Sequence, residues 1–448
     1  MVHSFSDRLT PRAPAAAILL AGFAAALIVN WPGHLEFDSI LQLLEGRTGR
    51  YSNWHPPVMS WLLGLSDAMS GDARWFVLLD TAMAFGALGT LLWIAERPGW
   101  SAVVAAAVAA ALPQLFFFQA IVFKDILFAD ACVAGFVCVA AAARWPRRRS
   151  AWLAGAVLFV TLAALARQNG FLIVPIAALT AAFIAPDRRR TGMEFLAACI
   201  VLMLGANALL QTRATGALGA TEQLEDLELY DLAGMMRKDP GLAVPILDRD
   251  APGMAKILHQ KGAAFYTPAA HDALADKSGM KPFIVSSIDA VARQWRASVW
   301  AHPLLYLSVR AADFSYVFLS LHPDVCPVYV VGVDGPAAAM KALNLRYRDD
   351  GRDDWLDDSY AGPLVGTPVF SHPFFAAVAI ACFVLLLHRR RPADLAMAGL
   401  LSATALYAAS YFVISLACEY RYLFAIDLSA IAAAFYLAAD FRARERSS

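Results

Sequence analysis

Two acidic side chains and an amide follow the first strongly apolar stretch of the chain. Glu36, Asp38 and Gln42 lie in the sequence EFDSILQ, directly after an apolar run that ends at Asn30. A carboxylate at the edge of hydrocarbon needs water or a partner, because an unpaired charge there is costly. It can serve as a general base toward a hydroxyl group or as a metal ligand, while an acidic surface loop is the simpler alternative. If the segment is helical, Gln42 shares a face with Asp38.

A stiff turn comes next in the sequence WHPP. The first proline restricts His55 to extended backbone, and the second proline is suited to the first turn of a helix. Such rigidity fits a loop that holds polar groups in fixed positions. His55 is therefore a candidate contact for a phosphate or a sugar, with packing inside the turn as the alternative.

Further polar motifs stand between apolar runs, and they bring basic side chains together with carboxylates. Arg421 is the clearest candidate for binding phosphate, because a guanidinium group matches two phosphate oxygens at once. A structural pair between Glu419 and Arg421 is the alternative. The pair of Lys124 and Asp125 either directs an amine at an anionic phosphate or marks a membrane boundary. The motifs are FKDILFA with Lys124 and Asp125, RQNG with Arg167 and Asn169, and EYRYL with Glu419, Tyr420 and Arg421.

The composition indicates an all-α polytopic membrane protein. Hydrophobic residues make up 59% of the chain, charged residues 17%, and the mean hydropathy is +0.53. The net charge of +0 leaves no basic surplus for a duplex, so the sequence predicts no nucleic-acid partner. The six cysteines show no paired spacing, and we expect neither a zinc site nor a disulfide framework.

Apolar runs predict about ten membrane spans. They divide the chain into an N-terminal membrane module (1–211), a large region without obvious spans (212–370) and a C-terminal group of three spans (371–448). Within the large region, residues 298–323 are apolar but contain Arg310 and Asp313, which favours a helix lying along the membrane surface over a span. The predicted spans are 15–30, 75–95, 102–122, 127–144, 152–166, 171–185, 195–211, 373–387, 395–417 and 425–440.

Arginine placement predicts the orientation. With a cytoplasmic N-terminus, the basic loops at 144–150, 187–190 and 388–391 and the C-terminal tail at 441–448 all fall on the cytoplasmic side. Both termini are then cytoplasmic. The first outer loop (31–74), for which we expect interfacial helices, and the region 212–370 lie outside. Every polar motif named above faces the same outer side.

The ordered set of motifs resembles the C-type glycosyltransferases, which are multi-span enzymes that use polyprenyl-phosphate sugars as donors. The similarity rests on EFDS followed by SNWHPP after the first span, and on FKDILFA, RQNG and EYRYL later in the chain. It covers the membrane part, and 212–370 is not matched. The resemblance implies a catalytic carboxylate in the first outer loop, for which Asp38 is the best match and Glu36 the second. It also implies that the basic residues of the other outer loops bind the lipid-linked phosphate.

The resemblance therefore predicts a membrane glycosyltransferase with Asp38 as general base, in the inner (plasma) membrane of a bacterium. Its expected partners are a polyprenyl-phosphate-linked sugar and an extracytoplasmic glycan or lipid acceptor, beside the membrane lipids. Glu36 and Asp38 are not an adjacent acidic pair, so no cofactor is assigned and the need for a divalent metal is left open. A transporter or flippase of a polyprenyl-linked lipid is the alternative, although the runs show neither clear repeats nor midplane polar groups.

Overall fold

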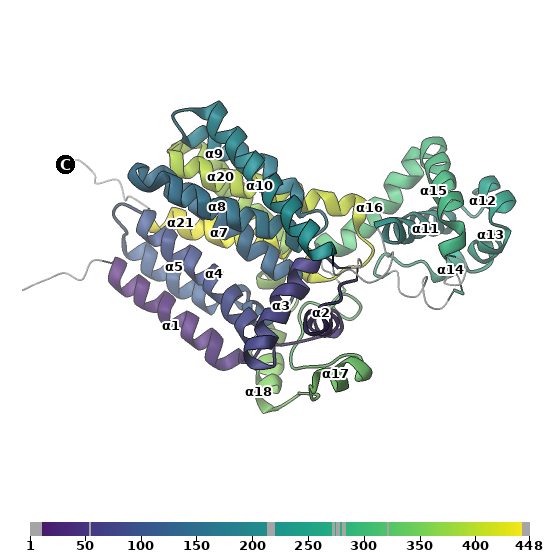
Figure 1. Ribbon diagram of the computed structural model, residues 1–448, viewed down its shortest axis with the longest axis horizontal. Helices are drawn as coiled ribbons and strands as arrows, with labels where there is room; N and C mark the ends of the chain where they lie inside the picture. The colour runs from purple at the N-terminus through teal and green to yellow at the C-terminus, as the bar shows by residue number, and fades with distance from the viewer. Residues whose placement is uncertain are drawn as a thin grey trace, which may run out of the picture.

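The computed structural model describes residues 11–52, 55–212, 220–270, 274, 278–279, 284–319 and 322–440. The molecule is an all-α polytopic membrane protein, with a helical bundle and a separate group of helices at one end of it (Figure 1). Within the described ranges, extended pairing is confined to isolated bridges. Predicted features at Trp54, at the first ten residues and in the basic tail 441–448 lie outside the described residues.

Each predicted span corresponds to helical structure in the bundle. Eight helices in the described ranges are long and apolar enough to cross a membrane. The third predicted span is broken, because α5 and the residues after it bend by 66° at Pro113, where proline begins a new helix. The sixth is shorter than a full span. The bundle helices are α1 (Arg12–Asn30), α4 (Arg74–Ile94), α5 (Trp100–Ala111), α6 (Pro113–Phe116), η1 (Phe118–Ala120), α7 (Lys124–Arg144), η2 (Pro146–Arg148), α8 (Arg149–Ala166), η3 (Gly170–Leu172), α9 (Ile173–Ile184), α10 (Arg188–Gln211), α19 (His372–Arg389), α20 (Pro392–Ile414), η10 (Tyr420–Leu423) and α21 (Phe424–Ala439).

Helix α7 forms the centre of the bundle. Nearly all of its residues are buried, and it packs against α4, α8, α20 and α21. The apolar side chains of α1 and α10 remain largely exposed, as expected for helices that face lipid. The first and last spans are joined through α4 and α5, since α1 and α21 both pack against these two helices, and the loops at the ends of these spans are brought close together.

The two ends of the bundle carry different chemistry. At one end the basic loops 144–150 and 388–391 lie near the ends of neighbouring helices, where Arg144 approaches Glu96 at 4.0 Å and Arg389 pairs with Asp440. The loop 187–190 also joins helices at this end. At the opposite end, here called the site end, lie the polar motifs of the sequence.

Two short helices in the first loop occupy the site end. They are α2 (Phe37–Thr48) and α3 (Pro57–Ser70), and they pack against each other as a hairpin (Figure 1). The contact is close because Gly46 faces Gly64, and a Cβ atom on Gly46 would stand 2.2 Å from the Ser60 carbonyl oxygen. Glu45 connects the hairpin further, since its carboxylate accepts from the Ser60 hydroxyl at 2.7 Å.

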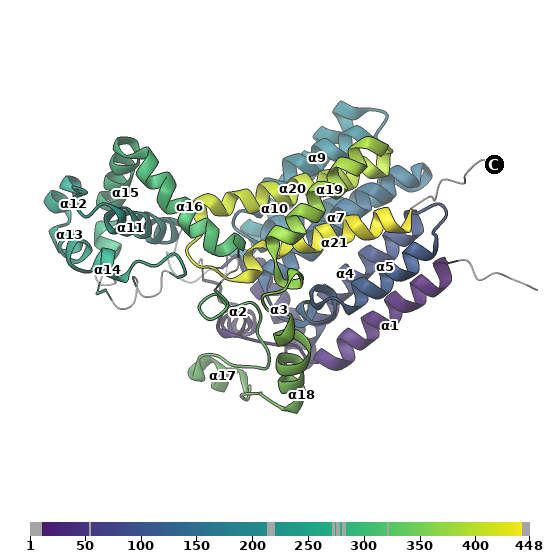
Figure 2. The ribbon, with the colours of Figure 1, turned by 180° about the vertical axis from the view of Figure 1, so that it is seen from behind.

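The region 212–370 contains two helical parts. The first has its own apolar core and extends beyond the bundle (Figure 2). It comprises α11 (Ala220–Lys238), α12 (Pro245–Asp250), α13 (Pro252–Ile257), η4 (Leu258–Gly262), α14 (Ala263–Phe265), α15 (Ile284–Ala301) and α16 (Pro303–Leu319). The second follows α16 and comprises α17 (Ala337–Leu343), α18 (Gly351–Asp354), η7 (Trp355–Ala361), η8 (Gly362–Leu364) and η9 (Pro368–Phe370).

A disulfide joins this region to the last spans, and this corrects the expectation that the cysteines are unpaired. Cys326 is bonded to Cys418 at a sequence separation of 92. Their separation leaves no spacing signal in the sequence, and only the fold brings them together. The four other cysteines are free and buried in the bundle.

Candidate active site

The site is centred on Arg421, which lies in η10 immediately before the last membrane helix. Its guanidinium donates to Asp38 Oδ2 at 2.9 Å and to Glu36 Oε1 at 3.2 Å. It also contacts the carboxylate of Glu419, and Asp125 Oδ2 lies 3.9 Å from its Nε. One guanidinium group therefore faces four carboxylates contributed by three separate loops.

The start of α2 positions the two carboxylates of the first loop. Glu36 is the N-cap of this helix, and its Oε1 accepts from the backbone N–H of Asp38 at 3.1 Å. Asp38 lies in the first helical turn, where a carboxylate is stabilised by the helix dipole. Side chains of this type at a helix start are common capping groups, and here the same groups also hold Arg421.

The environments of Glu36 and Asp38 shift their pKa values in opposite directions. Burial raises the pKa of Glu36 to about 7, with Arg421 opposing the rise and the neighbouring Asp38 charge adding to it. Burial also acts to raise the pKa of Asp38, but the positive charge of Arg421, which also donates a hydrogen bond to it, and the charge of Lys124 outweigh burial and lower the value to about 2. Asp38 is therefore ionised at neutral pH, while Glu36 titrates there.

Two further polar side chains, Lys124 and His55, form a chain of contacts that leads to Asp38. The Lys124 Nζ lies 2.6 Å from His55 Nδ1, and His55 Nε2 lies 3.7 Å from Asp38 Oδ1. Burial and the nearby Lys124 lower the pKa of His55 to about 3, so the ring is neutral. A neutral ring that accepts from Lys124 at Nδ1 carries its proton on Nε2, toward Asp38.

Arg167 completes the set of basic side chains. It follows the last residue of α8, and its NH1 lies 3.2 Å from Asp125 Oδ1. Its NH2 donates to the Tyr411 hydroxyl at 2.6 Å. Asp125 thus lies between Arg167 and Arg421, and holds the two guanidinium groups on one side of the bundle.

Aromatic rings form the apolar walls of this group. Phe123 lies under Arg421 with 4.2 Å between the guanidinium carbon and the ring centre. Tyr422 lies within 5.7 Å of Arg421 and 5.5 Å of Arg167, and it stacks on Tyr411. Cation–π contacts of this kind stabilise charge where water is scarce. We call the whole set the Arg421 cluster: Glu36, Asp38, His55, Lys124, Asp125, Arg167, Glu419 and Arg421.

Three predicted site residues stand at its edge or outside it. Gln42 lies one turn beyond Asp38 and is buried, and its Oε1 has no hydrogen-bond partner in the described structure. Asn169 donates to the Ser410 hydroxyl at 2.8 Å, which ties its turn to α20. Tyr420 points elsewhere, because its hydroxyl donates to Asp427 Oδ2 at 2.5 Å and its ring stacks on His372.

Several contacts in the cluster have no signal in the sequence. Phe123 and Tyr411 lie within or beside apolar runs, where an aromatic ring is ordinary. Only the position of Arg421 and Arg167 relative to these rings indicates a role for them. The nearest to a sequence clue is that Phe123 is the first residue of the FKDILFA motif.

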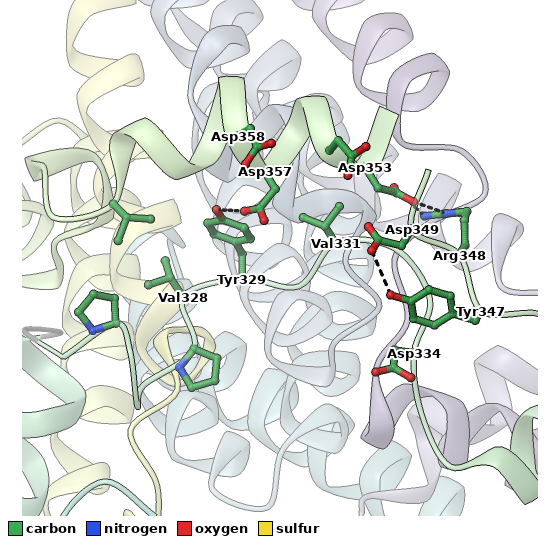
Figure 3. Close-up of a pocket in the computed structure, with 14 residues that line it drawn as sticks. Val328, Tyr329, Val331, Asp334, Tyr347, Arg348, Asp349, Asp353, Asp357 and Asp358 are labelled. Carbon is green, nitrogen blue, oxygen red and sulfur yellow. Dashed lines mark hydrogen bonds and ion pairs between the residues drawn. The ribbon is translucent and has the colours of Figure 1, made fainter. Parts of the chain in front are cut away.

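An acidic hollow lies in the part of the region 212–370 that follows α16 (Figure 3). It is a cavity of about 510 Å³ whose lining includes Tyr329, Tyr347 and the basic side chain of Arg348. Arg348 is already paired with Asp353 at 3.0 Å. The other carboxylates of the lining therefore leave the hollow strongly negative. They are Asp334, Asp349, Asp354, Asp357 and Asp358.

Backbone hydrogen bonds join the wall of the hollow to the loop of Glu36 and to the loop of Arg421. The Tyr420 N–H donates to the Pro327 carbonyl at 3.1 Å, and Cys326 is disulfide-bonded to Cys418. At the other end of the same segment, the Leu35 N–H donates to the Gly332 carbonyl at 3.0 Å. The segment 326–334 therefore connects the loop of Glu36 with the loop of Arg421.

A divalent metal fits poorly among these residues. Within the described ranges, no group of three or more His, Cys, Asp or Glu side chains is arranged to hold one. The guanidinium of Arg421 also occupies the space between Glu36, Asp38 and Glu419, where it would repel a cation. We assign no step to a metal.

Two comparisons with known proteins found a similar sequence or a similar structure. Residues 54–210 match the family described as Dolichyl-phosphate-mannose-protein mannosyltransferase. Among solved structures, the fold is similar to the archaeal oligosaccharyltransferase AglB from Archaeoglobus fulgidus in complex with an inhibitory peptide and a dolichol-phosphate. The sequence identity is 14% and the TM-score 0.40, over 94% of this chain and 50% of that chain, so this chain spans half of the archaeal protein's length. The search of curated proteins gives no match.

Proposed function

We propose that this protein is a membrane glycosyltransferase of the C-type, which moves a sugar from a polyprenyl-phosphate donor to an extracytoplasmic glycan or lipid acceptor. The observation that carries the proposal is the Arg421 cluster, where Arg421 holds Asp38 at 2.9 Å. The family match supports it, because residues 54–210 include His55, Lys124 and Arg167. Phosphate-binding groups and a carboxylate are the two parts that sugar transfer from a lipid phosphate requires.

The basic side chains of the cluster bind the donor phosphate. Arg421 and Arg167 are both held by Asp125, and Lys124 lies on the same helix turn as Asp125. Bound here, the phosphate is stabilised as it gains charge on leaving the sugar. The acidic hollow repels a phosphate, which directs the donor to the basic groups and leaves the hollow side to the acceptor.

Asp38 is the base in this proposal. The acceptor hydroxyl oxygen bonds to the anomeric carbon while the bond from that carbon to the phosphate oxygen breaks. The hydroxyl proton passes to Asp38, and the polyprenyl phosphate leaves with the electron pair. A carboxylate paired with arginine is a weak base, as the pKa of about 2 indicates. When the donor phosphate engages Arg421, Asp38 loses that partner and its basicity rises.

Two features support an extracytoplasmic site in the plasma membrane. The disulfide between Cys326 and Cys418 is at the site end, and disulfides persist in oxidising compartments. The basic loops 144–150 and 388–391 are at the opposite end, which the charge rule assigns to the cytoplasm. Both termini are cytoplasmic in this arrangement.

The test uses purified protein in nanodiscs with labelled polyprenyl-phosphate sugars and envelope glycans or lipids as acceptors. We expect transfer by the wild type, and loss of transfer in Asp38→Asn and Arg421→Ala with the protein still inserted. Glu194→Gln is the matched control, because Glu194 forms an exposed pair with Arg190 in α10. Equal labelling by all four proteins would remove the proposal. A flippase would form no glycosidic bond in this assay. A nanodisc also offers no second compartment, so lipid transport cannot account for a labelled acceptor.

A further inference from the structure

An apolar face of α16 is exposed although the helix belongs to a region rich in polar residues. Leu304 is 80% exposed and Leu307 46%. Ala311 is also exposed, and Phe314 and Phe318 are half-buried on the same side. These positions recur at helical spacing, so they form one continuous stripe. We call it the α16 stripe: Leu304, Leu307, Ala311, Phe314 and Phe318.

The opposite face of α16 is firmly attached to the protein. Arg310 is fully buried and pairs with Asp231 at 3.2 Å and with Asp313 at 2.5 Å. It also donates to the carbonyl oxygens of Val413 and Ser415, both at 2.7 Å. These two carbonyls are at the end of membrane helix α20, so α16 is fixed at the level where α20 leaves the membrane.

The stripe continues the lipid-facing surface of the bundle. Phe314 packs edge-on against Phe412 of α20, with 6.0 Å between ring centres. Next to Phe412, Val413 is 47% exposed and Ile414 36%. Helix α16 contacts the ends of both α19 and α20, and then leads away from them toward α15 (Figure 2). The apolar surface of the spans therefore continues from the end of α20 onto α16.

An aromatic side chain stands at the far end of the stripe. Trp300, the penultimate residue of α15, is 86% exposed at the corner where the chain turns into α16. Tryptophan is enriched at the boundary between headgroups and hydrocarbon. An exposed tryptophan beside two exposed leucines is unfavourable in water and favourable at that boundary.

We propose that the α16 stripe and Trp300 lie in the outer leaflet of the bilayer, at the headgroup boundary. The occupant of this face is lipid, because the face is continuous with the surface that lipid already covers. Helix α16 thus holds the helices α11–α15 against the membrane, and its other end contacts η10, which carries Arg421. The inference depends on the membrane position of α20 and holds whichever reaction the chain catalyses.

Spin labels test the depth of the stripe. The four free cysteines are replaced by alanine, the disulfide is kept, and one cysteine is introduced as Leu304→Cys, Leu307→Cys or Trp300→Cys. All three side chains are exposed, so a label there leaves the core intact. Val413→Cys is the lipid-facing reference, and Lys256→Cys on exposed α13 is the water-facing reference.

In nanodiscs we expect the three labels to collide with oxygen far more than with a water-soluble nickel chelate, as the Val413 label does. The Lys256 label should show the reverse ratio. Labels at all three positions that match Lys256 would overturn the proposal. Low access to both reagents would also overturn it, because protein and not lipid would then cover the stripe.

Discussion

Arg421 donates a hydrogen bond to Asp38 at 2.9 Å, although 383 positions separate the two residues. The contact joins the loop before the last span to the loop after the first span. Neither side chain is free in this arrangement, since the guanidinium also holds Glu36. A phosphate that binds Arg421 must therefore compete with two carboxylates, and its arrival changes the charge around Asp38.

Substituting Asp38 should abolish most of the chemistry without unfolding the protein. In Asp38→Asn the amide can still accept from Arg421, but it cannot take a proton from the acceptor. Loss of a general base lowers the rate by about 10² to 10⁴ fold. The measurement is single-turnover transfer at saturating donor. A variant that keeps its wild-type rate would exclude Asp38 as the base.

Substituting Arg421 with lysine should weaken donor binding. Arg421→Lys keeps the charge but loses the two-point geometry, and we expect a rise of about tenfold to a hundredfold in the KM for the donor. Removing Arg421 leaves Glu36 and Asp38 beside each other unpaired, so the lysine variant is the cleaner probe. An unchanged donor KM, with only the acceptor KM altered, would contradict the assignment of Arg421 to phosphate.

The raised pKa of Glu36 should make stability depend on pH. The folded protein holds this proton up to about pH 7, whereas an ordinary glutamate releases it near 4.5. Between these values the folded state holds this proton more firmly, so the contribution of Glu36 to stability is greatest below pH 4.5 and is lost as pH rises through 7. Glu36→Gln removes this dependence.

The measurement is the Tm of both proteins in detergent between pH 4.5 and 8. We expect the Tm of wild type minus that of Glu36→Gln to decrease as pH rises. A difference that stays constant over this range would show that Glu36 titrates normally.

The convergence of Asp38, Lys124 and Arg421 was predictable because each follows or precedes a long apolar run. Hydropathy fixes which end of a span a residue occupies, and alternation of spans then places these residues together. Hydropathy does not predict the direction in which a side chain points within a turn. Tyr420 and Arg421 are adjacent, but consecutive residues of a 3₁₀ turn point about 120° apart, and Tyr420 reaches Asp427 instead.

Contacts between residues far apart in the chain could not be predicted from the sequence for a related reason. Nothing near Cys326 or Cys418 distinguishes them from the four buried free cysteines, because their partnership depends on how the outer region folds back over η10. The same is true of Arg310, whose role as an anchor to α20 depends on the carbonyls at the end of that helix. Hydropathy describes the spans well and these long-range contacts poorly.

Breaking the disulfide should loosen the loop of Arg421. Cys418 directly precedes Glu419, and the cross-link closes a separation of 92 positions. A loop of this size contributes up to about 4 kcal/mol through the unfolded chain. We expect Cys418→Ser to lower the Tm and to raise the KM for the donor. Cys382→Ser, which changes a free buried thiol, is the control. Equal donor KM values for wild type and Cys418→Ser would show that the cross-link does not position Arg421.

The close contact between α2 and α3 should be sensitive to a single methyl group. In Gly46→Ala the new Cβ would stand 2.2 Å from the Ser60 carbonyl oxygen, so the two helices must separate. Overpacking of this kind costs about 1 to 3 kcal/mol. Because Asp38 lies on α2, transfer activity should fall together with the Tm.

Gly86→Ala is the matched control, since Gly86 lies within α4 with nothing near its missing side chain. There the change should leave activity intact and keep or raise the Tm, because alanine favours a helix over glycine by up to about 1 kcal/mol. If Gly46→Ala behaves like Gly86→Ala in both measurements, the α2–α3 contact does not hold Asp38 in place.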